Sequence, residues 1–114
     1  MAECIFCKVA NHELEAKIVH EDDELVAFHD INKKAPVHVL VITKRHLENL
    51  LDLSEGDDPL LGRIHRLLAN LARDLGVAES GFRVVVNSNR DAGQSVPHLH
   101  FHLLGGRPLG WPPG

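Results

Sequence analysis

Three histidines occupy alternate positions near the end of the chain, in the segment His98-Leu99-His100-Phe101-His102. Successive side chains of a β-strand point to opposite faces, so a strand here would place the three imidazoles on one face and the apolar side chains on the other. Imidazole titrates near neutral pH and can act as a nucleophile, a general base or a metal ligand. Same-face neighbours lie about 7 Å apart along a strand, so only one of the three imidazoles can occupy a reacting centre.

The loop before the triplet favours an anionic ligand. Ser95 offers a hydroxyl group, and the backbone amides around Gly93, Gln94 and Ser95 could point at phosphate oxygens. Histidine beside a bound phosphate indicates nucleophilic attack on phosphorus.

Two other interpretations of the triplet stay open from the residues alone. It could form the polar outer face of an edge strand, although such faces more often carry Lys, Glu and Thr. Alternatively, two histidines at positions i and i+2, with a third such as His38, could hold a catalytic zinc that keeps one coordination position open. No acidic residue accompanies the triplet in sequence to orient ligands of this kind.

Cys4 and Cys7 form a second group that could do chemistry, because two residues separate them. A metal site, a redox motif and ordinary thiols are the alternatives, and an expected cytoplasmic location argues against a structural disulfide. One such pair supplies half of a zinc site, which His46 and His98 would complete as a Cys2His2 set. His98 would then be a structural ligand that fixes the strand carrying His100.

The elements that must position these residues are short strands and one helix. Apolar runs predict antiparallel strands at 17–20, 24–29 and 37–43, a buried central strand at 82–86 and a last strand at 98–104. Between them, Leu residues and Ile64 recur at three- and four-residue steps, which predicts a helix from about 57–59 to Gly76 with one apolar face. The fold class is therefore α+β.

Length and composition limit the possibilities further. The 114 residues fit one domain spanning 1–114, and the formal net charge of -4, without a basic patch, argues against a nucleic-acid partner. No stretch approaches the roughly 18 apolar residues that a membrane span needs, and no secretion or transit signal is recognisable at the N-terminus. We therefore expect a cytoplasmic protein. Glycine and proline around Trp111 predict an extended tail docked on a surface.

The segment 93–104 resembles the His-x-His-x-His signature of the histidine triad family, and segments 5–8, 27–31, 35–38 and 111–114 resemble its Hint branch. The resemblance implies the HIT-like fold, in which an antiparallel five-stranded sheet with one main helix continues across a homodimer as ten strands. It also implies hydrolysis of purine nucleoside 5′-phosphoramidates and binding of purine nucleoside monophosphates.

The same resemblance implies the roles of individual residues. His100 would attack the α-phosphorus to form a nucleotidyl-histidine that water hydrolyses, with no cofactor needed for the chemistry. An acceptor, commonly a backbone carbonyl, must hold the far nitrogen of His100 so that the near nitrogen is free to attack. His102 and His38 would donate hydrogen bonds to the phosphate, and Ser95 would contact the phosphate or the leaving atom. Some histidine triad proteins also carry structural zinc at the position of Cys4, Cys7, His46 and His98.

For the nucleoside half, the resemblance implies that Asp30 accepts the two ribose hydroxyls. Composition alone would place Phe28 and Ile31 in the core. By the resemblance, the remaining members of the pocket are Ile5, Phe6, Phe28, His29, Ile31, Asn87, Gly93, Gln94 and, beside the partner's site, Trp111.

Two alternative functions stay open. One is dinucleoside polyphosphate hydrolysis of the Fhit-like kind, against which the Trp-Pro-Pro-Gly tail weighs. The other is a nucleotide-binding sensor with little turnover.

Overall fold

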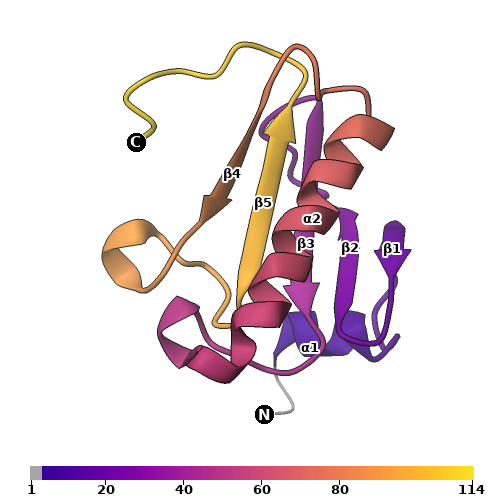
Figure 1. Cartoon of the computed structure of the whole chain (residues 1–114), viewed down its shortest axis with the longest axis vertical. Coiled ribbons are helices and arrows are strands. Elements are labelled where there is room, and N and C mark those ends of the chain that lie inside the picture. Colours follow the sequence, from indigo (N-terminus) through magenta and orange to yellow (C-terminus); the bar gives the residue numbers. More distant parts are fainter. Residues whose placement is uncertain (1–3) are drawn as a thin grey trace.

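The structure, a computed structural model, describes residues 4–114. One antiparallel sheet has the spatial order β1 (Ile18–Glu21), β2 (Leu25–His29), β3 (Val37–Thr43), β5 (His100–Gly105) and β4 (Phe82–Val86). Helix α2 (Asp58–Asp74) lies across the front of this sheet in Figure 1, and the short helix α1 (Ile5–Ala10) lies at its lower end. Three 3-10 turns, at Leu50–Asp52, Glu55–Asp57 and Arg90–Ala92, connect these elements. The predicted α+β class and five-stranded sheet are confirmed.

Helix α2 forms where the sequence predicts it. Pro59 occupies the first turn, where its missing N–H costs no hydrogen bond, and Gly76 follows the helix with a φ of 80°. The predicted apolar face is buried, with Ile64 and Leu68 at its centre. This face packs against Leu25, Val39 and Phe101 of the sheet and forms the larger of two core clusters.

Strand β5 serves both faces of the sheet, as its alternation predicts. Leu99, Phe101 and Leu103 pack under α2. The histidines occupy the other face, beside α1. The strand begins at His100, not at the predicted His98, because the amides of His98 and Leu99 donate to the carbonyls of Val96 and Leu47 and so leave the ladder.

The prediction of a central strand at 82–86 is wrong. Strand β4 lies at the edge of the sheet, where it pairs with β5 alone within the described residues, and Phe82 is 39% exposed. Its apolar run has another cause: Val84 and Val86 pack on the core under α2, whereas Val85 faces the opposite side. The predicted continuation of the sheet across a homodimer would need such an edge, and it stays a prediction.

Helix α1 has no counterpart among the sequence predictions. Its N-cap is Cys4, whose sulfur accepts a hydrogen bond from the Cys7 amide at 3.4 Å. Phe6 and Val9 pack with Val26, Phe28, Leu40 and Ile42 in the second core cluster. The helix therefore covers part of the histidine-bearing face and places both cysteines next to it.

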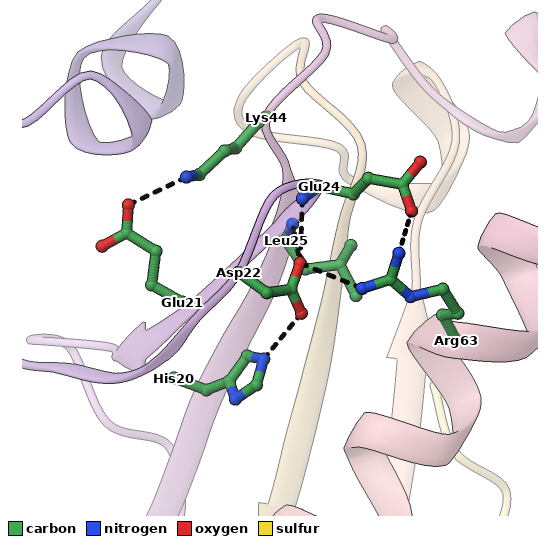
Figure 2. Close-up of polar contacts among 7 residues, drawn as sticks. All are labelled: His20, Glu21, Asp22, Glu24, Leu25, Lys44 and Arg63. Atoms are coloured by element: carbon green, nitrogen blue, oxygen red, sulfur yellow. Dashed lines mark hydrogen bonds and ion pairs between the residues drawn. The ribbon is translucent and has the colours of Figure 1, made fainter.

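A polar network joins the turn between β1 and β2 to α2 (Figure 2). Asp22 accepts from His20 and from the amides of Glu24 and Leu25, and it forms an ion pair with Arg63 of the helix. Burial opposes ionisation of Asp22, but these partners outweigh it and lower its pKa to about 2. Arg63 also pairs with Glu24, so one guanidinium ties the helix to the turn.

The C-terminal tail leaves its tryptophan uncovered. Trp111 is 81% exposed, and the Arg83 guanidinium lies 5.9 Å from the centre of its ring. The predicted place of Trp111 beside a partner's site stays a prediction. None of the helices described within residues 4–114 has the length and apolar character needed to span a membrane.

Candidate active site

A cavity of about 690 Å³ opens on the face of the sheet that carries α1. Its wall combines imidazoles of β3 and β5 with apolar side chains of α1 and β2. Most of the residues expected at the site line it: Ile5, Phe6, Phe28, His29, Asp30, Ile31, His38, Asn87, Ser95, His100 and His102. Side chains from five separate parts of the sequence therefore meet in one place.

Three residues expected in the pocket lie outside this lining: Gly93, Gln94 and Trp111. The amides of Gly93 and Gln94 donate to Arg90 and Asn89 within their own loop, so they are not free to bind phosphate as expected. The side chain of Gln94 donates to the carbonyls of Glu48 and Val96 at 2.6 and 3.0 Å. It fixes the loop that ends in Ser95.

His100 is buried and has one ring nitrogen tied to the backbone. Its Nδ1 lies 2.7 Å from the carbonyl oxygen of His98, and a carbonyl can only accept, so Nδ1 carries the hydrogen. In the neutral imidazole, Nε2 then keeps its lone pair. The ring of Phe6 lies against His100 at 5.1 Å between centroids, nearly perpendicular, and limits its rotation.

A chain of hydrogen bonds also determines which ring nitrogens of His38 and His102 carry a hydrogen. The Lys34 amide donates to Nδ1 of His38 at 3.0 Å, so Nε2 of His38 bears the hydrogen and donates to Nδ1 of His102 at 2.9 Å. Nε2 of His102 is then a donor. Burial lowers the pKa of His38 and, with the neighbouring imidazoles, lowers that of His102 to about 4. Both rings are neutral at pH 7.

Asp30 supplies the acid that the sequence does not place near the triplet. Its Oδ2 lies 3.4 Å from Nε2 of His38, and its Oδ1 accepts from the Asn32 amide at 2.8 Å. Within residues 4–114, Asp30, His38 and His102 could share a metal ion, since their ligand atoms lie within 4.8 Å of one another. This group excludes His100, so it differs from the catalytic zinc site that the triplet suggested.

The four residues expected to bind zinc meet at the N-terminus of α1. Nε2 of His98 donates to the Thr43 carbonyl at 2.7 Å, so its Nδ1 lone pair faces the sulfurs of Cys4 and Cys7 at 3.2 and 3.5 Å. Nδ1 of His46 lies 3.2 Å from the Cys7 sulfur. All four ligand atoms lie within 4.8 Å of one another. Two sulfurs and two imidazole nitrogens at this separation fit a tetrahedral structural zinc ion.

Without a metal ion, this cluster favours the neutral thiol of Cys7. Burial, and then the adjacent Cys4 thiol, raise the pKa of the Cys7 thiol. A bound divalent cation would reverse this effect, because coordination stabilises the thiolate.

The sequence does not predict the roles of Thr43 and Lys34. Their backbone groups orient His98 and His38, and a role of the backbone leaves no signal in the residue type.

Comparisons with known proteins agree on one family. The family model described as the HIT domain matches residues 11–109. A HIT-like protein of Synechocystis is 48% identical over 115 residues, and the match covers 100% of this chain and 100% of that protein. The purine nucleoside phosphoramidase of Escherichia coli is 44% identical over 108 residues, which cover 95% of this chain and 91% of that protein. The crystal structure of a HIT family hydrolase from Legionella pneumophila superposes with a TM-score of 0.96 at 45% identity, covering 98% of this chain and 100% of that one.

The low pKa of His102 predicts how stability depends on pH. In the unfolded protein, His102 takes up a proton near its ordinary pKa of 6.5. In the folded protein its pKa is about 4, so it takes up the proton only at lower pH. The unfolded state therefore binds more protons between these values, and stability should fall as the pH falls from 6.5 to 4. His102→Asn keeps an acceptor for His38 but does not titrate, so it should make this fall shallower. The free energy of unfolding in urea at pH 7 and pH 5 measures the effect.

His65→Asn is the control, because His65 is exposed on α2. It should keep the full loss of stability between the two pH values. An equal loss in His102→Asn and in the unchanged protein would contradict the burial of a neutral His102.

Proposed function

The chain belongs to the HIT domain family, and on this basis we propose that it hydrolyses the phosphorus–nitrogen bond of purine nucleoside 5′-phosphoramidates. Relatives named as a hydrolase and as a phosphoramidase support the reaction class. The observation that carries the proposal is the state of His100. Its Nδ1–H is tied to the His98 carbonyl, so Nε2 is the nitrogen that keeps a lone pair in the neutral ring, and the ring lines the cavity.

In the proposed reaction, the Nε2 lone pair of His100 attacks the α-phosphorus. A new bond forms between phosphorus and Nε2, the bond to the amine breaks, and the leaving nitrogen takes a proton from solvent water, which reaches the cavity at the exposed Ser95. A second water then attacks the same phosphorus and breaks its bond to Nε2. This step releases the nucleoside monophosphate, returns the proton of the attacking water to solvent and restores neutral His100. No oxidant, reductant or cofactor takes part in these steps.

His102 and Ser95 would hold the phosphoryl group. The Nε2–H of His102 can donate to a phosphate oxygen, and such a fixed donor stabilises charge that develops there. Ser95 lines the cavity with an exposed side chain, so its hydroxyl can contact the phosphate or the leaving nitrogen where water also has access.

We revise the role expected for His38. Its two nitrogens already bond the Lys34 amide and His102. It therefore acts as a positioning residue that orients His102, and does not itself bind the phosphate.

The nucleoside would lie across the apolar part of the cavity. The Oδ2 atom of Asp30 lies beside His38, and Oδ1 accepts from the Asn32 amide. The same carboxylate would accept hydrogen bonds from the ribose hydroxyls. Phe6 and Phe28 are buried in the second core cluster and still form part of the cavity wall. Ile31 is 92% exposed and lines the same cavity, so a core role does not explain it, whereas contact with a base does.

The test compares three kinds of substrate and two variants. Adenosine 5′-phosphoramidate and guanosine 5′-phosphoramidate should release ammonia and the nucleoside monophosphate faster than diadenosine polyphosphates are cleaved. His100→Ala should lower the rate constant for release about a thousandfold or more, because it removes the nucleophile, yet still bind the monophosphate. His65→Ala, on the far face, is the control and should keep the rate.

The other outcomes separate the alternatives. Preference for diadenosine polyphosphates would support the Fhit-like reaction, and binding without turnover would support the sensor. Retention of the phosphoramidase rate in His100→Ala would remove His100 from the chemistry.

We also propose that Cys4, Cys7, His46 and His98 hold a structural zinc ion. Support comes from their donor set and from the Thr43 carbonyl, which leaves Nδ1 of His98 unprotonated toward the two sulfurs. The ion would join α1 and the segment after β3 to the start of β5. It would stabilise the fold and fix His98, whose carbonyl holds His100.

Elemental analysis of protein purified with zinc and without chelators should find about one zinc per chain. Cys4→Ser should lower the zinc content and the Tm, because it removes one of four ligands. His65→Asn, which changes a histidine outside the cluster, should alter neither. A zinc-free protein under these conditions would refute the site. A folded zinc-free protein that regains lost activity with zinc would instead favour a catalytic metal at Asp30, His38 and His102.

A further inference from the structure

The strand pairing shows that the cavity runs across the strands of the sheet. Phe28 of β2, Leu40 of β3 and His102 of β5 lie opposite one another on adjacent strands, and all three line the cavity. On the other side of β2, the His29 amide donates to the Lys17 carbonyl at 3.1 Å, so the segment leading into β1 runs next to β2. Three strand spacings of about 4.8 Å separate this segment from β5. The cavity thus extends roughly 14 Å across the sheet.

This length orients the nucleotide of the proposed function. Phosphorus lies at His100 on β5 and the ribose at Asp30, which follows β2. The base must then extend beyond β2, toward the segment 14–16. Leu14, Ala16 and Ile31 form an apolar end of the cavity there.

Among residues 12–18, Glu15 is the charged residue that lines the cavity, whereas Glu13 and Lys17 border only an outer groove next to it. Glu15 also borders this shallow outer groove, which it shares with Leu14, Ala16 and Ile31, so it lies at the rim. Its side chain is exposed and takes part in none of the side-chain hydrogen bonds or ion pairs formed within residues 4–114. By contrast, Glu21 and Glu24 are engaged by Lys44 and Arg63.

A carboxylate at the base end distinguishes the two purines. Guanine presents two adjacent donors, N1–H and the N2 amino group, to which two carboxylate oxygens can accept side by side. Adenine presents one donor, the N6 amino group, next to the N1 lone pair, which a carboxylate repels. We propose that Glu15 binds this edge of the base and makes guanosine nucleotides the preferred substrates. The inference rests on the proposed function, because that function places the base at this end.

Calorimetric binding of three monophosphates tests the proposal. GMP should bind about tenfold more tightly than AMP, as expected for hydrogen bonds to a charged acceptor at a partly solvated rim. IMP keeps N1–H but lacks the N2 amino group, so its affinity should fall between them. In Glu15→Gln the amide can accept from N6 and donate to N1 of adenine, so the preference for GMP over AMP should disappear or reverse.

Glu13→Gln is the matched control, since Glu13 borders the outer groove but does not line the cavity. It should keep the preference of the unchanged protein. Equal binding of GMP and AMP by the unchanged protein, or a preference unaltered in Glu15→Gln, would overturn the role of Glu15 and leave the proposed hydrolase standing. Failure to bind any of the three monophosphates would overturn the proposed function and the inference with it.

Discussion

The hydrogen bond from Nδ1 of His100 to the carbonyl of His98 decides which nitrogen of the central histidine can react. For this bond to form, the carbonyl must turn toward the side chain two residues ahead, so the chain at His98 cannot belong to the regular ladder. The structure meets this condition: the His98 amide bonds Val96, the Leu99 amide bonds Leu47, and β5 starts only at His100. His98 is itself held through Nε2 by the Thr43 carbonyl. The ring of His100 is therefore oriented by the His98 carbonyl, and the ring of His98 by the Thr43 carbonyl.

Burial of the histidine side chains affects their protonation as well as their orientation. Loss of hydration lowers the pKa of His38, His98 and His102, so these three rings stay neutral and keep their hydrogens on the nitrogens that the backbone contacts select. Asp30 acts in the opposite direction on His38 and His102, but its effect is smaller than that of burial. The sheet provides this environment because β5 buries Leu99, Phe101 and Leu103 under α2 while α1 closes part of the histidine face.

Part of this arrangement could be predicted from the sequence, because it depends on periodicity. Alternation predicts that the histidines lie opposite Leu99 and Phe101, and leucine spacing predicts α2. The six residues of α1 are too few to show a helical period, so the sequence does not predict this helix. The apolar run at 82–86 does not distinguish a central strand from an edge strand that is covered by a helix on one face, so the sequence does not predict the edge position of β4.

The four cysteine and histidine residues of the predicted zinc site do meet in the structure, but other contacts between distant segments leave no pattern in the sequence. Asp30 meets His38 through the pairing of β2 with β3, and Lys34 and Thr43 act through backbone atoms that any residue could supply. The loop residues Gly93 and Gln94 matched a phosphate-binding pattern, yet their amides are bonded within the loop. The family could be recognised from the sequence, whereas the roles of the zinc ligands, of Trp111 and of the dimer edge stay predictions.

The tautomer of His100 is the most direct test of these conclusions. Nitrogen-15 NMR of protein labelled at histidine distinguishes protonated from unprotonated ring nitrogens, and the His100→Gln variant identifies the signals of this residue by their loss. At pH 7 we predict that Nδ1 of His100 carries the hydrogen, as the bond to the His98 carbonyl requires, and that Nε2 does not, as nucleophilic attack by this nitrogen requires. A hydrogen on Nε2, or on both nitrogens, would contradict the assignment of His100 as a nucleophile prepared by its own backbone.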